Sequence, residues 1–162
     1  MVRRETPRVA LNGEVGKGHD AIDERLSAWM IAQPVFFIAT APLDPAGSVN
    51  CSPKGNRQEF AVIDDHTVAY LDQTGSGVET IAHLRENGRI TVMLCAFEGP
   101  PKIVRFHGSG TVLLPGDAEF ERLATLWGTT RLGARSIVLV DVARVSPGLL
   151  LRLLAPYGGH GD

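Results

Sequence analysis

The sequence of 162 residues is poor in the features that mark specialised protein classes. Its two cysteines, Cys51 and Cys95, form no CxxC pair and have no histidine at ligand spacing, so we expect small buried thiols rather than a disulfide framework. No apolar run reaches the roughly 18 residues that a membrane-spanning helix needs. Residues 1–18 lack the apolar segment of a secretory signal. These absences predict a cytoplasmic protein with no membrane partner.

An excess of charge of one sign is also lacking. Sixteen lysines and arginines are balanced by eighteen aspartates and glutamates, for a formal net charge of −2. Without a basic field the chain is not expected to bind nucleic acid or an anionic membrane surface. Glycine and proline, in contrast, are abundant at 18 and 10 residues. This abundance indicates many turns, and therefore many short strands, within a globular domain of ordinary size.

The hydrophobic pattern divides the chain into three parts. Residues 1–18 carry no apolar period and are interpreted as an N-terminal arm. Residues 19–148 contain the regular patterns and form the predicted domain. Residues 149–162 begin with a leucine-rich stretch, a C-terminal tail that we expect to pack on its own domain or on a second copy.

Periodic apolar residues predict three helices. Ile22, Leu26 and Met30 recur at four-residue spacing and indicate a helix that begins after Asp20, the expected N-cap, and ends at Pro34. The second helix is expected over residues 78–86, where Asn87-Gly88 ends it, and the third from residue 117 onward.

Runs of β-branched and aromatic residues, separated by turn residues, predict strands at 35–41, 48–52, 59–63, 67–71, 89–97, 102–114 and 135–145. The first is apolar throughout and is expected to be buried on both faces, and it forms a hairpin with the second. Gly108 and Gly110 inside the long strand indicate a bulge, a bend or the close approach of a ligand. The pattern favours a mainly β barrel of six or seven antiparallel strands with flanking helices.

The most informative motif is Asp72-Gln-Thr-Gly-Ser-Gly-Val-Glu-Thr80, where a strand ends and a helix begins. Backbone N–H groups of such a loop converge with partial positive charge and suit a phosphate. The candidate ligands are Thr74, Gly75, Ser76, Gly77 and Thr80. An ordinary glycine-rich turn with Ser76 as a helix cap explains the same residues, because the motif is neither a GxGxxG nor a Walker loop.

A second motif, Ser52-Pro-Lys-Gly55, is expected directly after a strand and includes the candidate residues Ser52, Lys54 and Gly55. Lys54 can place its ammonium group on a phosphate, although a solvated lysine fits equally well. Arg105 and His107 share one face of the long strand, where charge requires a partner, a ligand or exposure. No HExxH or GxSxG pattern occurs, so no metal site and no hydrolase elbow is predicted.

Four segments carry a resemblance: Gln33-Pro-Val-Phe-Phe-Ile-Ala-Thr-Ala, Val49-Asn-Cys-Ser-Pro-Lys-Gly55, Tyr70-Leu-Asp-Gln-Thr-Gly-Ser-Gly and His83-Leu-Arg-Glu-Asn-Gly-Arg-Ile-Thr-Val-Met. Together they resemble the pyridoxamine 5'-phosphate oxidase-like family, and more narrowly its short bacterial flavin-binding branch. The resemblance implies a split β-barrel and a homodimer with FMN in two clefts at the subunit interface. It implies that Lys54 approaches the flavin phosphate, that Thr74 lies near the ring or the phosphate, and that Arg105 matches a family arginine.

The chain departs from the family at three places, one of which is Ile103, where some members carry a glutamine just before the arginine of the long strand. Family oxidases carry an Arg-Lys pair where this chain has Glu79 and Thr80, and their C-terminal arginine motif has no counterpart in residues 149–162. The leading hypothesis is therefore an FMN-dependent oxidoreductase acting on a small molecule other than pyridoxamine phosphate. The alternatives are a flavin carrier without turnover, a deazaflavin- or heme-binding relative with His83 or His107 as the heme ligand, and a structural interaction domain.

Overall fold

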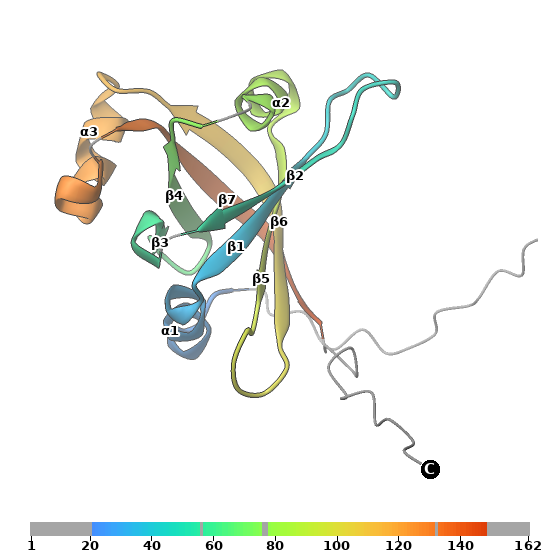
Figure 1. Ribbon diagram of the computed structural model, residues 1–162, viewed down its shortest axis with the longest axis vertical. Coiled ribbons are helices and arrows are strands. Elements are labelled where there is room, and N and C mark those ends of the chain that lie inside the picture. Colours follow the sequence, from blue (N-terminus) through green and yellow to red (C-terminus); the bar gives the residue numbers. More distant parts are fainter. Residues whose placement is uncertain (1–20, 56, 76–77, 132, 149–162) are drawn as a thin grey trace, which may run out of the picture.

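The computed structural model of this protein describes residues 21–55, 57–75, 78–131 and 133–148. Within these residues seven antiparallel strands form one sheet in the order β2-β1-β5-β6-β7-β4-β3. The sheet curls into a barrel that is left open, because the edge strands β2 and β3 do not pair with each other (Figure 1). The predicted split β-barrel is confirmed. The predicted arm, residues 1–18, and tail, residues 149–162, lie outside the described residues.

The strands agree with the predicted ones in number and order. Their bounds are β1 Val35–Thr40, β2 Asn50–Gly55, β3 Phe60–Val62, β4 Thr67–Gln73, β5 Arg89–Cys95, β6 Ile103–Leu113 and β7 Ala134–Gly148. The β1–β2 hairpin is confirmed, with Phe36 opposite Lys54 and Ile38 opposite Ser52. Two short 3₁₀ segments, η1 Arg57–Glu59 and η2 Thr125–Arg131, complete the connections.

Two expectations for the β1–β2 hairpin were wrong. β1 is not buried on both faces: Phe36, Ile38 and Thr40 point into the barrel, whereas the alternate residues are half-exposed on its outer face. β2 does not end before Pro53 but continues through Lys54 to Gly55. An edge strand accommodates proline because only one of its sides must supply hydrogen bonds to the sheet.

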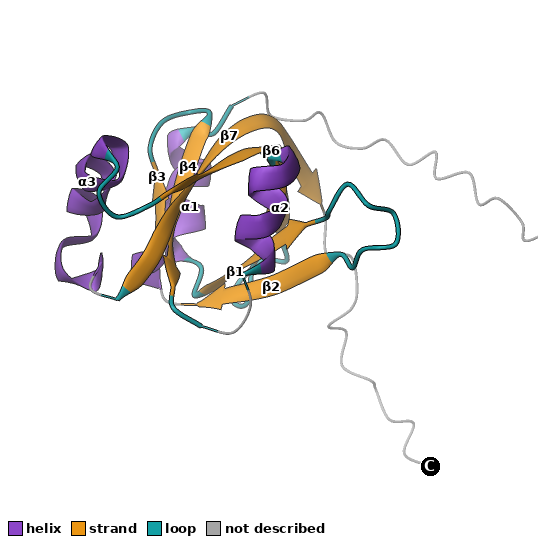
Figure 2. Ribbon diagram, turned by 90° about the horizontal axis from the view of Figure 1, so that it is seen from above, coloured by secondary structure: helices purple, strands orange, loops and turns teal. Residues whose placement is uncertain are grey.

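Three helices flank the barrel, namely α1 Glu24–Ala32, α2 Glu79–Asn87 and α3 Ala118–Ala124. The N-cap of α1 is Asp23 and not Asp20, because the Asp23 Oδ1 accepts a 2.7 Å hydrogen bond from the Leu26 N–H. α2 ends as predicted at Gly88, which has a left-handed backbone with φ of 71°. Figures 1 and 2 show α1 and α2 at opposite ends of the barrel and α3 on its outside.

The two glycines of β6 serve packing within the chain. The pairing of β6 with β7 shifts register between His107 and Gly108, and a Cβ at Gly108 would lie 1.9 Å from the Asp141 carbonyl oxygen. A Cβ at Gly110 would lie 2.8 Å from the Leu84 side chain of α2. The predicted bulge is therefore confirmed, and the close approach involves the backbone of β7 and helix α2.

The apolar core has two parts. The larger fills the barrel and includes Phe36, Tyr70, Val92 and Phe106, with Met30 of α1 closing one end. The smaller lies between α3 and the outer face of β4 and β7, where Leu71, Phe120 and Leu123 meet other buried residues. No helix in the described ranges is both long enough and apolar enough to cross a membrane.

Candidate functional site: a charged cluster at the opening of the barrel

A buried carboxylate lies at the opening of the barrel and contacts two cations. Asp72, near the end of β4, is 1% exposed. Its Oδ1 accepts a 3.0 Å hydrogen bond from the Lys54 ammonium of β2. Its Oδ2 accepts bonds from the Arg135 Nε and Nη2 atoms of β7, at 2.9 and 2.7 Å. The Ser136 hydroxyl lies 3.4 Å from the same oxygen.

The strand pattern explains why these side chains meet. Lys54 pairs with the buried Phe36, so it faces the interior of the barrel rather than the solvent side of the sheet. Asp72 pairs with Ser136 on the neighbouring β7. Since β2 is an edge strand and does not pair with β4, the Lys54–Asp72 ion pair connects strands across the opening of the barrel. Lys54 was therefore wrongly expected to follow the strand, because it lies within β2.

Burial shifts the pKa of two neighbours of this cluster. Desolvation raises the pKa of the Glu59 carboxyl above its ordinary value, against a hydrogen bond from Gln73 and the charge of Lys54, which lower it. Burial, with the Asp72 charge as a further cause, raises the pKa of the Tyr70 phenol. Tyr70 is therefore a neutral hydroxyl at any physiological pH.

Two buried hydroxyl groups on the strands that carry Lys54 and Asp72 have unused hydrogen-bonding capacity. Neither the Ser52 Oγ nor the Tyr70 hydroxyl finds a hydrogen-bond partner among the described residues. Ser52 lies two residues before Lys54 on the inner face of β2, and Tyr70 lies two residues before Asp72 on β4. A buried hydroxyl without a partner is costly, and such groups in native structures are usually satisfied by water or a ligand.

The glycine-rich loop begins beside this cluster. Thr74 follows β4 directly, and its hydroxyl donates a 3.2 Å hydrogen bond to the carbonyl oxygen of Gly133, two residues before Arg135. Gly75 is exposed, and a Cβ there would meet no atom closer than 3.9 Å. The candidates Ser76 and Gly77 lie outside the described residues.

The first turn of α2 supplies no cation to this region. Glu79 is exposed, and Thr80 is buried with its hydroxyl accepting a 2.8 Å hydrogen bond from the Asn50 side chain of β2. Among the candidates that sequence predicted, Lys54 and Thr74 are placed at the opening of the barrel, Ser52 lies on its inner face, and Gly55 ends β2. Thr80 instead joins α2 to β2.

Arg105 lies on the other side of the sheet. It alternates with the buried Val104 and Phe106 of β6 and pairs with Met93 and Ser146 of the neighbouring strands. Since Lys54 faces the interior, the structure does not bring Arg105 to the Asp72 cluster within one chain.

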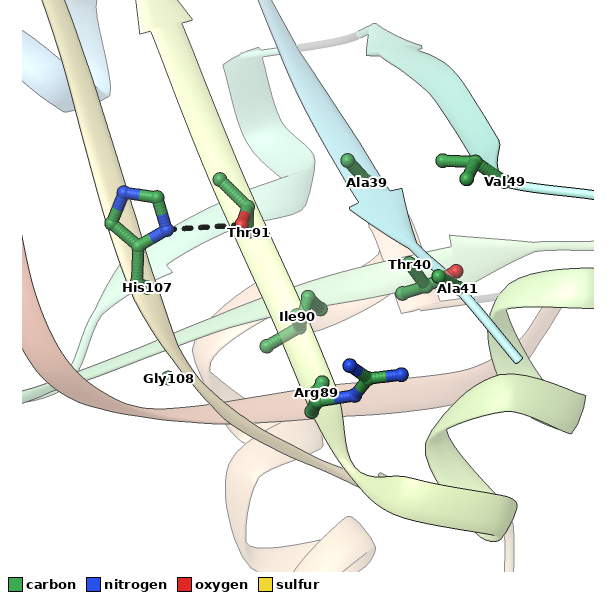
Figure 3. Close-up of a pocket in the computed structure, with 9 residues that line it drawn as sticks. All are labelled: Ala39, Thr40, Ala41, Val49, Arg89, Ile90, Thr91, His107 and Gly108. Carbon is green, nitrogen blue, oxygen red and sulfur yellow. Dashed lines mark hydrogen bonds between the residues drawn. The ribbon is translucent and has the colours of Figure 1, made fainter. Parts of the chain in front are cut away.

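The outer face carries a cavity of about 410 Å³ instead. Figure 3 shows the residues that line it, namely Ala39, Thr40, Ala41, Val49, Arg89, Ile90, Thr91, His107 and Gly108. Desolvation lowers the pKa of the His107 imidazole, and the charges of Arg144 and Arg105 add to this shift. A neutral His107 shares a 3.2 Å hydrogen bond between its Nδ1 and the Thr91 hydroxyl.

Histidine 83 differs from His107 in its surroundings. It is 9% exposed, and its Nδ1 lies 3.0 Å from the Thr40 hydroxyl, so it joins α2 to β1. Within the described parts of the chain no three His, Cys, Asp or Glu residues gather in an arrangement suited to a metal ion.

Sequence reasoning missed Asp72 as a central residue and did not consider Arg135. Asp72 was considered only as the first residue of the loop motif. A charged residue inside an apolar strand was the reason for selecting Arg105, and Asp72 meets the same criterion in the strand Thr67–Gln73. Arg135 is the second residue of β7, and an arginine at the start of a strand is unremarkable. Its role depends on the pairing of β7 with β4, which no local pattern indicates.

Fold and cluster together define a split-barrel protein whose opening holds two cations around one buried carboxylate. A model of the family described as pyridoxamine 5'-phosphate oxidase matches residues 22–150, and the chain belongs to this family. The pyridoxamine 5'-phosphate oxidase family protein ustO of Aspergillus flavus is 40% identical over 129 residues, which are 78% of this chain and 51% of that protein. The chain thus spans about half the length of this curated relative.

Solved structures share the fold. A variant of HupZ from Group A Streptococcus has a TM-score of 0.63 at 24% identity, covering 78% of this chain and 99% of that one. An FMN-binding protein from Syntrophomonas wolfei has a TM-score of 0.54 at 16% identity, covering 80% and 92%. An FAD-binding protein from Mesorhizobium loti has a TM-score of 0.51 at 18% identity, covering 76% and 89%.

Proposed function

We propose that this chain binds a flavin, FMN in preference to FAD, and that the complex is an oxidoreductase acting on a small molecule other than pyridoxamine phosphate. The observation that carries the proposal is the pair of cations at the opening of the barrel, next to the loop that begins at Thr74. Solved structures of similar fold include an FMN-binding protein and an FAD-binding protein, which supports the proposal.

The residues present fit the phosphate of a flavin. Lys54 supplies an ammonium group and Gly75 a backbone N–H group, as a phosphate requires, and the Thr74 hydroxyl would add a third donor by giving up its bond to the Gly133 carbonyl oxygen. The buried hydroxyls of Ser52 and Tyr70, on the strands that carry Lys54 and Asp72, add unused hydrogen-bonding capacity. A bound flavin would supply the electron transfer, so the chain needs to bind, orient and shield the cofactor rather than to provide an acid–base pair.

The proposal includes a homodimer with the cofactor clefts at the subunit interface. It is motivated by the outer face of β1, β5 and β6, where Phe37, Met93 and Ile103 are only half-buried in the single chain. Light scattering coupled to size exclusion should then give twice the chain mass, and a monomer that still binds flavin would overturn this part. A cytoplasmic location stays a prediction.

The direct test is a parallel titration of the purified protein with FMN, FAD, deazaflavin and heme, followed by absorption spectroscopy. We expect a stoichiometric complex with FMN that is tighter than the complex with FAD. Heme is included in the titration because His107 lines the outer cavity and could be its ligand, whereas His83 is buried against Thr40. Failure to bind any flavin would refute the proposal, and a Soret band that His107→Ala abolishes would favour heme.

A carrier without turnover is the second candidate, favoured by the absence of a cation in the first turn of α2, where Glu79 is exposed. Reduction of the bound flavin, followed by stopped-flow mixing with oxygen and candidate acceptors, separates the two functions. Oxidation faster than that of free reduced flavin supports an oxidoreductase, and slower oxidation supports a carrier.

A further inference from the structure

Resting on the proposed flavin binding, we propose that Arg135 is a second cation for the ligand's phosphate, and that Asp72 is the positioning residue that holds Arg135 and Lys54 toward it. The Asp72 carboxylate of β4 bonds to Lys54 of β2 and to Arg135 of β7, and so connects the three strands.

A flavin phosphate requires more positive charge than Lys54 alone supplies. A phosphate monoester carries between one and two negative charges near neutral pH. The first turn of α2 offers none of the required positive charge, since it begins with Glu79 and Thr80. The structure instead brings an arginine from β7 to within 2.7 Å of the carboxylate that also holds Lys54.

Burial within the cluster differs between the carboxylate and the two cations. The Asp72 side chain is 2% exposed, whereas the Lys54 and Arg135 side chains are each 22% exposed. The carboxylate therefore lies at the inner end of the cluster, and both cations lie nearer to the solvent. Two cations around one carboxylate leave an excess of one positive charge among these three groups, which the neighbouring Glu59 carboxylate reduces when it is ionised. The ion pairs restrict both cationic side chains before a ligand arrives. Such preorganisation lowers the entropic cost of binding.

Two buried hydroxyls on the same strands as the ion pairs have no hydrogen-bond partner among the described residues. Tyr70 is completely buried, its hydroxyl has no partner among the described residues, and it lies two residues before Asp72 on β4, with its side chain on the same face of the strand. Ser52 offers a second unpartnered hydroxyl on the face of β2 that carries Lys54. Two unpartnered buried hydroxyls on the strands that carry Lys54 and Asp72 leave hydrogen-bonding capacity for water or for a ligand's oxygen atoms.

A hydrogen bond and a strand pair connect the start of β7 with the start of the glycine-rich loop. The Thr74 hydroxyl bonds to the Gly133 carbonyl oxygen, and Gln73 pairs with Ala134. The start of the loop and the start of β7 are therefore held side by side, and Arg135 follows immediately. The backbone of β7 therefore brings Arg135 close to Thr74, where the loop begins.

The test compares FMN with riboflavin, which lacks the phosphate. Dissociation constants are measured by flavin fluorescence for the wild type, Arg135→Gln, Arg135→Lys and the matched control Arg122→Gln, whose guanidinium pairs with Glu119 on α3. For Arg135→Gln we expect FMN affinity to fall roughly 10- to 100-fold while riboflavin affinity changes less than about 3-fold, as for loss of one charge-assisted hydrogen bond. Arg135→Lys should retain most of the preference for FMN, and Arg122→Gln all of it.

Asp72→Asn tests the positioning role. It removes the charge but keeps the shape, and we expect the preference for FMN over riboflavin to shrink although Lys54 and Arg135 are both present. A residue that only stabilised the barrel would weaken both flavins equally, so an unchanged preference would overturn this role.

The outcomes separate the two proposals. If the wild type binds neither flavin, the proposed function fails and the inference falls with it. If the wild type prefers FMN and Arg135→Gln keeps that preference, only the inference is overturned. Loss of riboflavin binding by Arg135→Gln would indicate that this variant does not fold, and a competition experiment then replaces it. Inorganic phosphate should weaken the binding of FMN to the wild type and to Arg135→Lys without weakening the binding of riboflavin. Absence of this competition overturns the inference.

Discussion

The ammonium of Lys54 on edge strand β2 lies 3.0 Å from the carboxylate of Asp72 on β4, two strands that are not hydrogen-bonded to each other. This ion pair connects the two sides of an open barrel. Across the same interior, the Phe36 ring lies 5.0 Å from Phe60 and 5.4 Å from Tyr70, centroid to centroid. Aromatic contacts and one buried carboxylate thus hold together strands that the sheet itself leaves unpaired.

Removal of the Asp72 charge should destabilise the fold. Asp72→Asn leaves Lys54 and Arg135 partly buried without their counter-charge, and we expect a loss on the order of 3 kcal/mol, since both cations keep some contact with solvent. Urea denaturation measures the change in the free energy of unfolding. The control is Glu119→Gln, which breaks an exposed pair with Arg122 and should leave stability unchanged within error. Equal effects of the two substitutions would contradict a buried role for Asp72.

Lys54→Gln should weaken the binding of FMN. Loss of one charge-assisted hydrogen bond corresponds to roughly 1.5–3 kcal/mol, or about a 10- to 100-fold higher dissociation constant. Lys102→Gln serves as the control, because the Lys102 ammonium lies 4.4 Å from the centre of the Trp29 ring and away from the Asp72 cluster. Fluorescence titration provides the measurement, and an unchanged affinity of Lys54→Gln would move the phosphate elsewhere.

Two glycine substitutions should differ sharply in stability. A Cβ at Gly108 would lie 1.9 Å from the Asp141 carbonyl oxygen, a backbone atom that cannot move without distortion of the β6–β7 pairing. We expect Gly108→Ala to cost about 3 kcal/mol or more, at the upper end of the range for overpacking. A Cβ at Gly55 would meet nothing within 4 Å, so Gly55→Ala should be neutral. Thermal unfolding of the two variants, side by side, checks the expected order.

Stability should depend on pH through His107. Its pKa is lowered in the folded state by desolvation and by Arg144 and Arg105, so the unfolded chain binds the proton more readily. The contribution of the neutral imidazole is complete above the unfolded pKa of about 6.5 and is lost as the pH falls from there toward the folded value. Denaturation between pH 5 and 8 should show a steeper acid-side decline for the wild type than for His107→Gln. Parallel curves would show that His107 does not contribute.

Much of the fold was predictable because its signals are local. The apolar runs, the turn residues and the glycine after Asn87 predicted the strands in their observed order and the end of α2. The errors concern features that depend on which strand or layer lies next to a segment in the fold. β2 was expected to end before Pro53, and the sequence does not show that β2 is an edge strand, which accepts proline. The apolar residues Phe37 and Ala39 were expected to be buried, but they are half-exposed, because no second layer among the described residues covers the outer face of β1.

The candidate site was predictable only in part. Lys54 and Thr74 were identified from motifs whose residue types suit an anion, and both lie at the opening of the barrel. Arg105 was included because of its charge in an apolar strand, but alternation places it on the outer face. Asp72 and Arg135 gain their importance from contacts across 18 and 63 residues of chain.

The sequence by itself determined the number and order of the elements, the antiparallel hairpins, the glycine-rich loop and the membership of a family, since each depends on neighbouring residues or on a linear motif. The tertiary structure alone decided which charges meet. An alternating pattern assigns a residue to one face of its strand, but the order of strands and the curl of the sheet determine which faces lie opposite each other. The contact of Lys54 and Arg135 with one buried carboxylate is a product of that closure.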